Sequence, residues 1–322
     1  MNYIKMSPIV GMSGYGGGAT ALPFSGISVP KWEGNYGVVS GGHDGNSNQD
    51  VINRWSIDTT GNASDHGDLV HERNAIASCG GEGRGITAGG HYAVNRDWID
   101  YFSFSTAGNA SDFGDLTVAR NGLGACCDAL RACFLAGNDA GGVSNHIDYI
   151  TVANTGNATD FGDYDESVEA VSCVNDATRA IGYGGDSGGG ARADMFYWTI
   201  QTTGNSSSFA NLANARKYAN GCSNLTKALI AGGHQAMNEM EHITVQSASN
   251  GTDFGDLTVG RRGLGSGGSS EGDRACWGGG MNQNNNNHYN TIDYTSFSSP
   301  GNAGDFGDLT NTPQWSSGAS GD

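Results

Sequence analysis

The chain is poor in proline and in long apolar segments. Only 5 of its 322 residues are proline, whereas 54 are glycine. So much glycine argues against a helical protein, because glycine in a helix interior costs about 1 kcal/mol relative to alanine. No apolar run approaches the ~20 residues that span a bilayer, so we expect no membrane insertion. The N-terminus also lacks the apolar core of a signal peptide, and we expect synthesis in a host cytoplasm.

Basic residues are scarce as well. The chain has 16 Lys and Arg against 33 Asp and Glu, which gives a formal net charge of −17. Nucleic acids and anionic membranes are bound through clusters of Lys and Arg, so this composition argues against both as partners. The excess of acidic residues favours solubility instead.

What the chain does have is an internal repeat. The stretch Gly-Asn-Ala-Ser-Asp-Phe-Gly-Asp-Leu at 108–116 returns with changes, and successive copies begin 45 to 52 residues apart. The other copies lie at 61–69, 156–164, 204–212, 249–257 and 301–309. A period of this length is typical of solenoids and propellers.

Each unit has four parts. The first is a short apolar strand ending in glycine, followed by a loop that differs from copy to copy. A second strand runs into the Gly-Asn turn, and a third follows it, as in 115–120. The fourth is made of tiny residues, as in Gly124-Ala125-Cys126. Six strands of such small side chains are expected where space is scarcest, around the axis of a β-propeller.

The two ends of the chain predict how the ring closes. The repeat begins at 36 with a glycine-ended strand and ends just after a small-residue strand. We therefore expect 315–320 to complete the blade begun by 36–42, which buries both edges. The prediction is an all-β, single six-bladed propeller with four-stranded blades over 30–322. A Gly-rich N-terminal arm at 1–29 precedes it.

The seven cysteines cannot all pair within one chain, and the absence of Cys-x-x-Cys leaves zinc without support. Four of them are assigned to one repeat position and two to another: Cys79, Cys126, Cys173 and Cys222, then Cys133 and Cys276. Other copies carry Gly267, Ala319, Ile86 and Leu229 there. We expect buried free thiols made in a reducing compartment.

The glycine-ended strands, such as 228–233, resemble kelch repeats, which also place an Arg before the next blade. Here that Arg is found four times: Arg73, Arg120, Arg216 and Arg261. The Trp that follows the turn in kelch repeats is missing. The wording of 99–101 and 108–120, Ile-Asp-Tyr and Gly-Asn-Ala-Ser-Asp-Phe-Gly-Asp-Leu-Thr-Val-Ala-Arg, is similar to repeats in structural proteins of marine tailed phages and large viruses. That resemblance implies a virion setting.

The repeated turn invites several interpretations. Asn-x-Ser/Thr would be a glycosylation site in a secreted protein, but we expect Asn to serve left-handed turn geometry. Asp-Phe-Gly-Asp resembles the Asp-box of sialidases without its Trp. It offers two or three oxygens, whereas an EF-type calcium loop needs about five ligands. We expect a solvated Asx turn with a buried Phe.

The residues that follow the glycine-ended strands form a second predicted ring: His43, His91, Asn138, Asp186, His234 and Met281. Its three histidines suggest a metal or proton-transfer site, but they belong to separate blades, so we predict polar rim residues and no metal. The variable loops should share one face, and variation on one face of a rigid scaffold indicates binding. The candidate ligand-binding residues are His43, Asp44, His91, Tyr92, Asp186, His234, Asn284, Asn286, His288 and Tyr289.

No catalytic motif stands out. Glycoside hydrolysis needs two carboxylates within roughly 5–10 Å, and the available acids are scattered over different loops: Asp44, Asp97, Asp186 and Glu241. We expect a non-enzymatic virion protein without cofactors, a tail-associated, fibre or capsid-decorating module. It would bind other virion proteins through 1–29 or its uniform face, and a host surface glycan or protein through the variable loops. The alternatives are a carbohydrate-binding receptor module and, further away, a glycan-cleaving enzyme.

Overall fold

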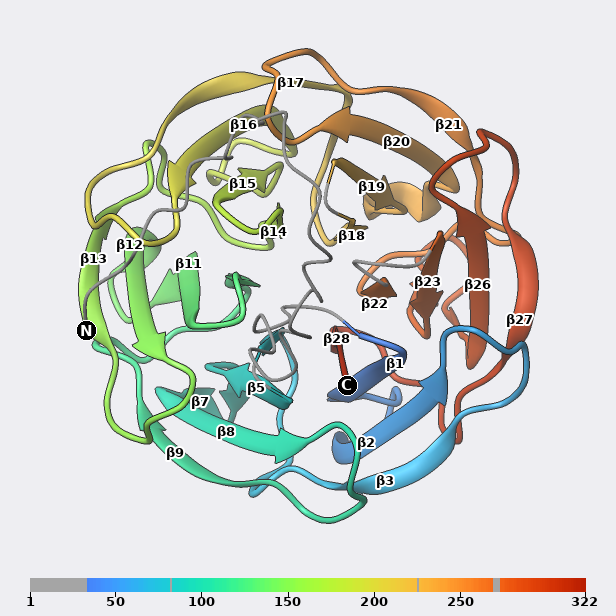
Figure 1. The fold of residues 1–322 in the computed structure, drawn as a ribbon, viewed down its shortest axis with the longest axis horizontal. Coiled ribbons are helices and arrows are strands. Elements are labelled where there is room, and N and C mark those ends of the chain that lie inside the picture. The colour runs from blue at the N-terminus through green and yellow to red at the C-terminus, as the bar shows by residue number, and fades with distance from the viewer. Residues whose placement is uncertain (1–33, 82, 225, 269–272) are drawn as a thin grey trace, which may run out of the picture.

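The computed structural model of the chain describes residues 34–81, 83–224, 226–268 and 273–322. Within them, six four-stranded antiparallel sheets surround a central channel (Figure 1). The protein is therefore an all-β, six-bladed β-propeller, as the repeat predicts. The proposed arm at 1–29 lies outside the described residues. No helix in the described ranges is long and apolar enough to cross a membrane.

Each blade runs from an inner strand at the channel to an outer strand at the rim. Blade 1 contains β28 (Ser317–Gly321), β1 (Tyr36–His43), β2 (Asn48–Ser56) and β3 (Ser64–Asp68). Blade 2 contains β4 (Ala77–Gly81), β5 (Arg84–Ala88), β8 (Trp98–Ser103) and β9 (Ser111–Asp115). Blade 3 contains β10 (Gly124–Cys127), β11 (Arg131–Asp139), β12 (Gly142–Thr151) and β13 (Thr159–Asp163).

The remaining three blades follow the same order. Blade 4 contains β14 (Ser172–Asn175), β15 (Arg179–Tyr183), β16 (Arg192–Thr199) and β17 (Ser207–Arg216). Blade 5 contains β18 (Asn220–Ser223), β19 (Lys227–Ala231), β20 (Glu239–Thr244) and β21 (Thr252–Asp256). Blade 6 contains β22 (Gly265–Gly268), β23 (Arg274–Gly278), β26 (Thr291–Ser296) and β27 (Gly304–Asp308).

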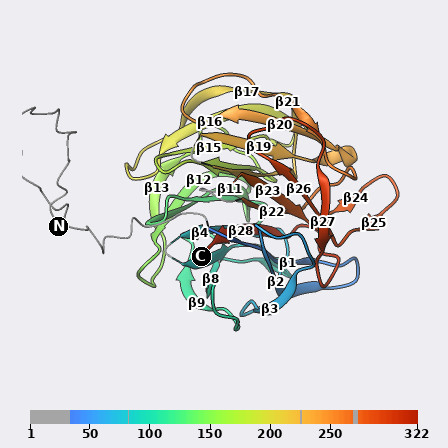
Figure 2. The same cartoon turned by 45° about the vertical axis from the view of Figure 1, so that its right-hand side comes forward.

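The ring closes as the sequence predicts. The C-terminal strand β28 pairs with β1 in antiparallel register, with Ala319 opposite Val38. Figure 2 shows β28 beside the N-terminal blade rather than with its neighbours in sequence. Because the two ends of the chain share one sheet, β1 is paired on both sides, with β28 as its inner partner.

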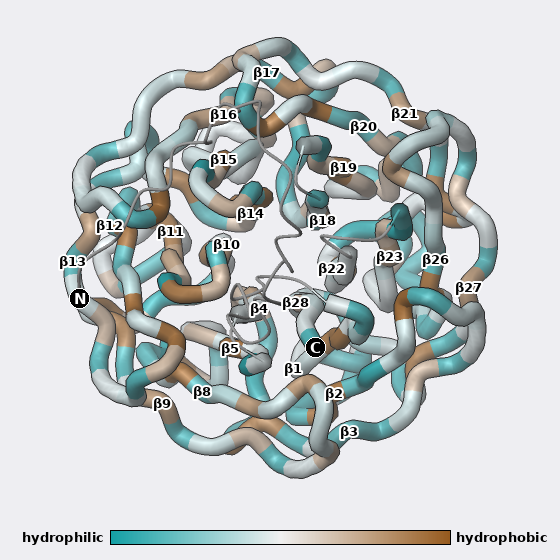
Figure 3. The backbone as a smooth tube through the Cα atoms, in the orientation of Figure 1, coloured by the Kyte–Doolittle hydropathy of each residue, from teal (hydrophilic) through white to brown (hydrophobic). Residues whose placement is uncertain are grey.

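The hydrophobic core lies between the blades. Each buried apolar cluster combines residues of two neighbouring blades, as where Ile86 and Phe113 of blade 2 meet Phe134 of blade 3. Figure 3 shows hydrophobic segments along the strands and hydrophilic ones at the outer turns. In five blades the Phe of the outer strand also meets a ring of the third strand edge to face, as Tyr101 and Phe113 do at 5.9 Å.

The structure corrects the assignment of the outer strand. Asp-Phe-Gly-Asp is not a solvated turn but the outer strand itself, β9 in blade 2, and the segment after Asp115 is a connection to the next blade. The reason is the pairing of β9 with β8, in which Asp112 lies opposite Asp100. The expected burial of Phe113 is confirmed, because its side chain is 2 % exposed. Gly114, at φ 146°, lies where the pairing of β8 with β9 shifts, so a bulge bends this strand around the rim.

All seven cysteines are buried thiols. Burial raises the pKa of Cys126 and Cys133 well above the usual thiol value, so both stay protonated. The assignment of Cys173 to the same repeat position as Cys126 is wrong by one residue. Cys173 lies opposite Gly182, whereas Val174 lies opposite Ile181 as Cys126 lies opposite Cys133.

The Asn of each Gly-Asn stretch links two blades. Asn109 Oδ1 accepts a hydrogen bond from the backbone N–H of Asp68 in the preceding blade, at 3.2 Å. The same bond joins Asn62 to Asp308, Asn157 to Asp115, Asn205 to Asp163, Asn250 to Asn211 and Asn302 to Asp256. None of these six asparagines has a positive φ, so the expectation of left-handed turn geometry is wrong. Asparagine is required here because its side-chain oxygen accepts a hydrogen bond from the outer strand of the preceding blade.

A cation from each blade also bonds to the next blade. Arg84 stacks on Tyr101 of its own blade and donates to the Val152 carbonyl of blade 3, at 2.9 Å. The other links run from Arg54 to Phe104, Arg131 to Ile200, Arg179 to Val245, Lys227 to Phe297 and Arg274 to Ile57. All six blade junctions therefore carry the same two polar links.

Buried ion pairs anchor the segments that lead to the channel. The four repeated arginines each pair with a carboxylate of their own blade: Arg73 with Asp100, Arg120 with Asp148, Arg216 with Glu241 and Arg261 with Asp293. In the other two blades the corresponding positions hold Val168 with Phe196, and Pro313 with Asn53. A charge is thus placed in the core only where its partner is present, as the cost of burying a lone ion requires.

Candidate functional site

The predicted ring of residues after the glycine-ended strands surrounds one end of the channel. His91 pairs with Asn74 through backbone hydrogen bonds, and both residues lie beyond the paired ends of β4 and β5. Equivalent contacts join His43 to Gln314, Asn138 to Asn121, Asp186 to Glu169, His234 to Lys217 and Met281 to Arg262. The described residues contain no group of three potential metal ligands.

The side chains of His43 and Asp44 shape their own loop. His43 Nδ1 accepts from the Gly45 N–H at 2.9 Å. Asp44 Oδ1 accepts from the backbone of Asn46 and Ser47 at 2.8 and 2.9 Å. These two backbone bonds lower the pKa of Asp44 because they favour its charged form. Both candidates thus already have partners within the turn.

Asp186 and His234 are brought near each other by Lys217. The Lys217 ammonium donates to Asp186, whose other oxygen accepts from the N–H of Gly188 at 2.8 Å and of Gly190 at 3.1 Å. The bond from Lys217 is the main reason that the pKa of Asp186 is lowered. Burial, and next the charge of Lys217, lower the pKa of His234, so its imidazole stays neutral. This cluster joins the loops of blades 4 and 5.

The Asn-rich loop of blade 6 forms a turn between β24 (Met281–Asn282) and β25 (Asn287–His288). Asn284 N–H bonds to Asn282 Oδ1 at 2.9 Å, and Asn286 is left-handed at φ 57°. Both residues are exposed. His288 lies against Gly45, with Nε2 3.2 Å from where a Cβ of that glycine would be. Tyr289 is half-buried, and its N–H donates to the Gly280 carbonyl.

Tyr92 lies in a separate hairpin made by β6 (His91–Tyr92) and β7 (Val94–Asn95). It is 40 % exposed, and the Arg96 guanidinium lies 5.6 Å from its ring. The ten predicted residues therefore occupy one rim but do not converge on one site. They form local contacts in several neighbouring loops.

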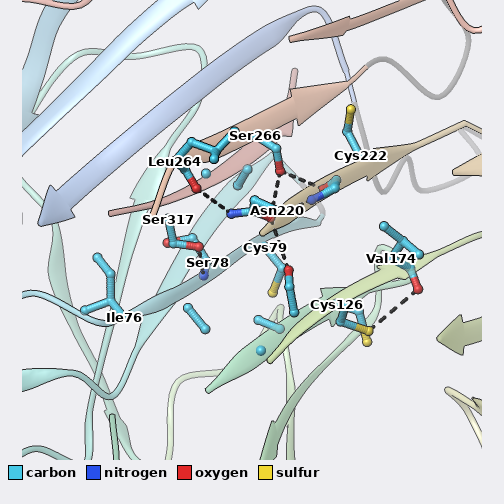
Figure 4. Close-up of a pocket in the computed structure, with 18 of the residues that line it drawn as sticks. Ile76, Ser78, Cys79, Cys126, Val174, Asn220, Cys222, Leu264, Ser266 and Ser317 are labelled. Atoms are coloured by element: carbon cyan, nitrogen blue, oxygen red, sulfur yellow. Dashed lines mark hydrogen bonds between the residues drawn. The ribbon is translucent and has the colours of Figure 1, made fainter. Parts of the chain in front are cut away.

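The channel itself is lined by the small-residue strands, as predicted. It holds about 900 Å³ of space between its walls, part of it open to solvent. Figure 4 shows Asn220 as its central polar group. Asn220 Nδ2 donates to the Leu264 carbonyl at 3.0 Å, and its Oδ1 accepts from Ser266 Oγ at 3.0 Å and Ser172 Oγ at 3.2 Å. One side chain thus joins the inner strands of blades 4, 5 and 6.

A pocket of about 180 Å³ opens at the channel mouth. The polar and aromatic residues that line it are Asn74, His91, Asn121, Glu169, Tyr218 and Trp315. Only His91 of the ten predicted residues lines this pocket, so most of the site was not predicted from the sequence. The available signal was the position two residues after that of the repeated arginines. It holds Ala75, Gly122, Ala170 and Gly263 in four blades and Tyr218 and Trp315 in two.

All six residues at this position have left-handed backbone angles, with φ from 51° to 63°. Glycine adopts this conformation freely, but a bulky residue there is a strained outlier. Tyr218 has φ 59° and Trp315 has φ 51°. The ring of Trp315 lies over Gly263, with Cδ1 3.1 Å from where a Cβ of that glycine would be. The two aromatic residues therefore flank a glycine on one side of the mouth.

A scan against protein-family models finds no match for this chain, and a search of curated proteins finds no similar sequence. The repeat and the geometry of the variable face and the channel mouth are therefore the basis for inferring a function.

Proposed function

We propose that this protein is a non-enzymatic structural component of a virion. It would be a tail-associated, fibre or capsid-decorating propeller, made in the host cytoplasm. Residues 1–29 would attach it to other virion proteins, and the variable-loop face would contact a host surface glycan or protein. The wording of the repeat, which is similar to that in structural proteins of marine tailed phages and large viruses, supports the virion setting.

The observation that carries the attachment role is the contrast between a uniform frame and a varied face. All six junctions have the same Asn link and the same cation link, whereas the connections between second and third strands differ from blade to blade. Blade 3 has a tight turn at 140–141, and blade 5 has a 3₁₀ turn, η1 (His234–Ala236). Blades 2 and 6 carry the extra hairpins β6–β7 and β24–β25. A rigid scaffold with diverse loops on one face is suited to recognition.

Three of the four acidic residues considered for a glycan-cleaving enzyme have structural partners. Glu241 is 1 % exposed and pairs with Arg216 in the core. Asp186 pairs with Lys217, and Asp44 accepts two backbone bonds in its own turn. The lowered pKa values of Asp186 and Asp44 keep these two carboxylates ionised, so they are poorly suited to act as general acids. This supports a non-enzymatic function.

The carbohydrate-binding alternative has one specific observation in its favour, the aromatic and amide-lined pocket at the channel mouth. Attachment through a glycan would join the two candidate functions in one protein.

The test is to isolate virus particles from the source of this chain and to identify its copy number by mass spectrometry and negative-stain imaging. The full chain is compared with a chain that lacks 1–29, which keeps both strands that close the ring. We expect the full chain at a symmetric stoichiometry and loss of the shortened chain from particles. Absence of the full chain from particles would refute the virion proposal.

A further inference from the structure

The channel mouth has the features of a built ligand site. Two aromatic residues occupy backbone positions at which the other four blades have Gly or Ala. Backbone strain of this kind persists where the surroundings or the function require it. Both aromatic residues line the pocket at the channel mouth.

We propose that the pocket at the channel mouth binds one neutral sugar ring of a glycan, with Trp315 and Tyr218 as its aromatic wall and Glu169, Asn74 and Asn121 as its polar wall. This inference deepens the attachment role proposed above by naming the ligand class. It does not depend on where the protein sits in a particle.

The size of the pocket fits a single ring. Its volume of about 180 Å³ slightly exceeds the ~150 Å³ of a protein cavity that takes up benzene. A pyranose ring presents C–H groups on its faces and hydroxyls around its edge. The aromatic residues offer surfaces for the C–H groups, and the amides and the carboxylate offer partners for the hydroxyls.

The polar wall is held in place by neighbouring loops. Asn74 Nδ2 donates to Asn48 Oδ1 at 2.5 Å, and Asn121 Nδ2 donates to Asn95 Oδ1 at 2.6 Å. The side-chain oxygens of Asn74 and Asn121 accept no hydrogen bond from the described residues. Each amide is therefore fixed at its nitrogen end and offers an acceptor at the other. Burial, and next the nearby Glu169, raise the pKa of Tyr218, so its phenol remains a donor.

The charges around the pocket favour a neutral sugar over an acidic or a cationic ligand. Glu169 is the carboxylate of the pocket wall and would repel a sialic acid. The closest ammonium, Lys217, is already paired with Asp186. A cationic ligand would meet Arg262, whose guanidinium lies 5.3 Å from the Tyr218 ring and 5.9 Å from the Trp315 ring.

The test uses the full chain on a glycan array with termini of neutral hexose, N-acetylhexosamine and sialic acid. Calorimetric titration with the methyl glycoside of the strongest neutral terminus then gives an affinity. The decisive variants are Trp315→Gly and Tyr218→Gly, because glycine relieves the backbone strain and already occupies this position in two blades. Val70→Ala, at an exposed apolar residue that lies outside the pocket and is not a candidate ligand-binding residue, is the control.

We expect each glycine variant to weaken binding at least about tenfold, the loss of roughly 1.4 kcal/mol of stacking and packing. The thermal unfolding midpoint should stay the same or rise, since strain is removed. Val70→Ala should bind as the wild type does. The inference is overturned if no neutral glycan binds, if binding survives in both glycine variants, or if sialylated termini are preferred. None of these outcomes would alter the particle-association test of the virion proposal.

Discussion

The guanidinium carbon of Arg54 lies 4.5 Å from the centre of the Tyr36 ring. The strands that carry the cation and the phenol are exchanged relative to blade 2. In blade 2 the cation, Arg84, is on the second strand and the phenol, Tyr101, on the third. In blade 1 the phenol is on β1 and the cation on β2. Arg54 nevertheless donates to the Phe104 carbonyl of the next blade at 2.6 Å, as Arg84 does to its own neighbour. The link between blades is therefore kept with the stacked pair in either order.

This exchange predicts a rescue. Arg54→Ala removes the stacking on Tyr36 and the bonds to the carbonyls of Phe104 and Ser105. It should lower the free energy of unfolding by about 1–3 kcal/mol. The double variant Tyr36→Arg/Arg54→Tyr restores the arrangement of blade 2 and should recover at least half of that loss. Urea unfolding followed by circular dichroism measures both, and a double variant no more stable than Arg54→Ala would contradict the interpretation.

The buried ion pairs make a second prediction. Arg120 is fully buried and pairs with Asp148 at 2.8 Å. Asp148→Ala leaves the guanidinium in the core without its carboxylate, which should cost about 3–5 kcal/mol. At the equivalent positions blade 4 has the apolar residues Val168 and Phe196. The double variant Arg120→Val/Asp148→Phe should therefore be more stable than Asp148→Ala alone. Equal stability of the two variants in urea unfolding would show that the charge imbalance is not the cause.

The sequence predicts the architecture well because each feature it depends on is repeated. Six small-residue strands indicate a crowded axis, and the missing partner at each end of the chain indicates the closure by β28. The outer strand was misplaced because Asp-Phe-Gly-Asp has the composition of a turn. The pairing with β8 and the bulge at Gly114 identify it as a strand. The Asn links were missed because they join residues of different units.

The candidate site was predicted less well. The residues after the glycine-ended strands are evident as a column, so the ring around the mouth could be anticipated. The pocket depends on which segments meet at the axis and on a left-handed backbone that Ala75 and Ala170 also adopt. Because two of the six residues are alanine, the sequence pattern does not reveal that this position needs a left-handed backbone. The large side chains of Tyr218 and Trp315 in an otherwise small-residue column were the one available indication.

The closing strand gives a third prediction, through a pair of glycines. A Cβ at Gly318 in β28 would lie 2.2 Å from the backbone oxygen of Ser266 in β22, and backbone cannot move aside cheaply. Gly318→Ala should therefore lower the free energy of unfolding by about 1–3 kcal/mol or more. Gly108 has open space around its Cα, so Gly108→Ala should be neutral or slightly stabilising. Similar urea midpoints for the two variants would show that β28 is held less tightly than the structure indicates.

His66 gives the fourth prediction, because it occupies a place where the other five outer strands have Phe. It is 2 % exposed, its Nε2 lies 2.6 Å from the Ser103 carbonyl, and its Nδ1 has no partner within the described residues. Burial is the main cause that lowers the pKa of His66, so the folded state favours the neutral imidazole.

The sign of the pH effect follows from that shift. The unfolded chain, with an ordinary His pKa of about 6.5, binds the proton more readily than the folded chain. The stability contributed by neutral His66 is complete above about pH 6.5 and is lost as the pH falls from there through the lowered pKa of the folded state. His66→Phe should remove this loss, so its advantage over the wild type in urea unfolding should grow between about pH 7.5 and pH 5.5. Phe113→His, the reverse change in blade 2, should introduce the same pH dependence. A constant difference between wild type and His66→Phe across this range would mean that His66 is not the titrating group.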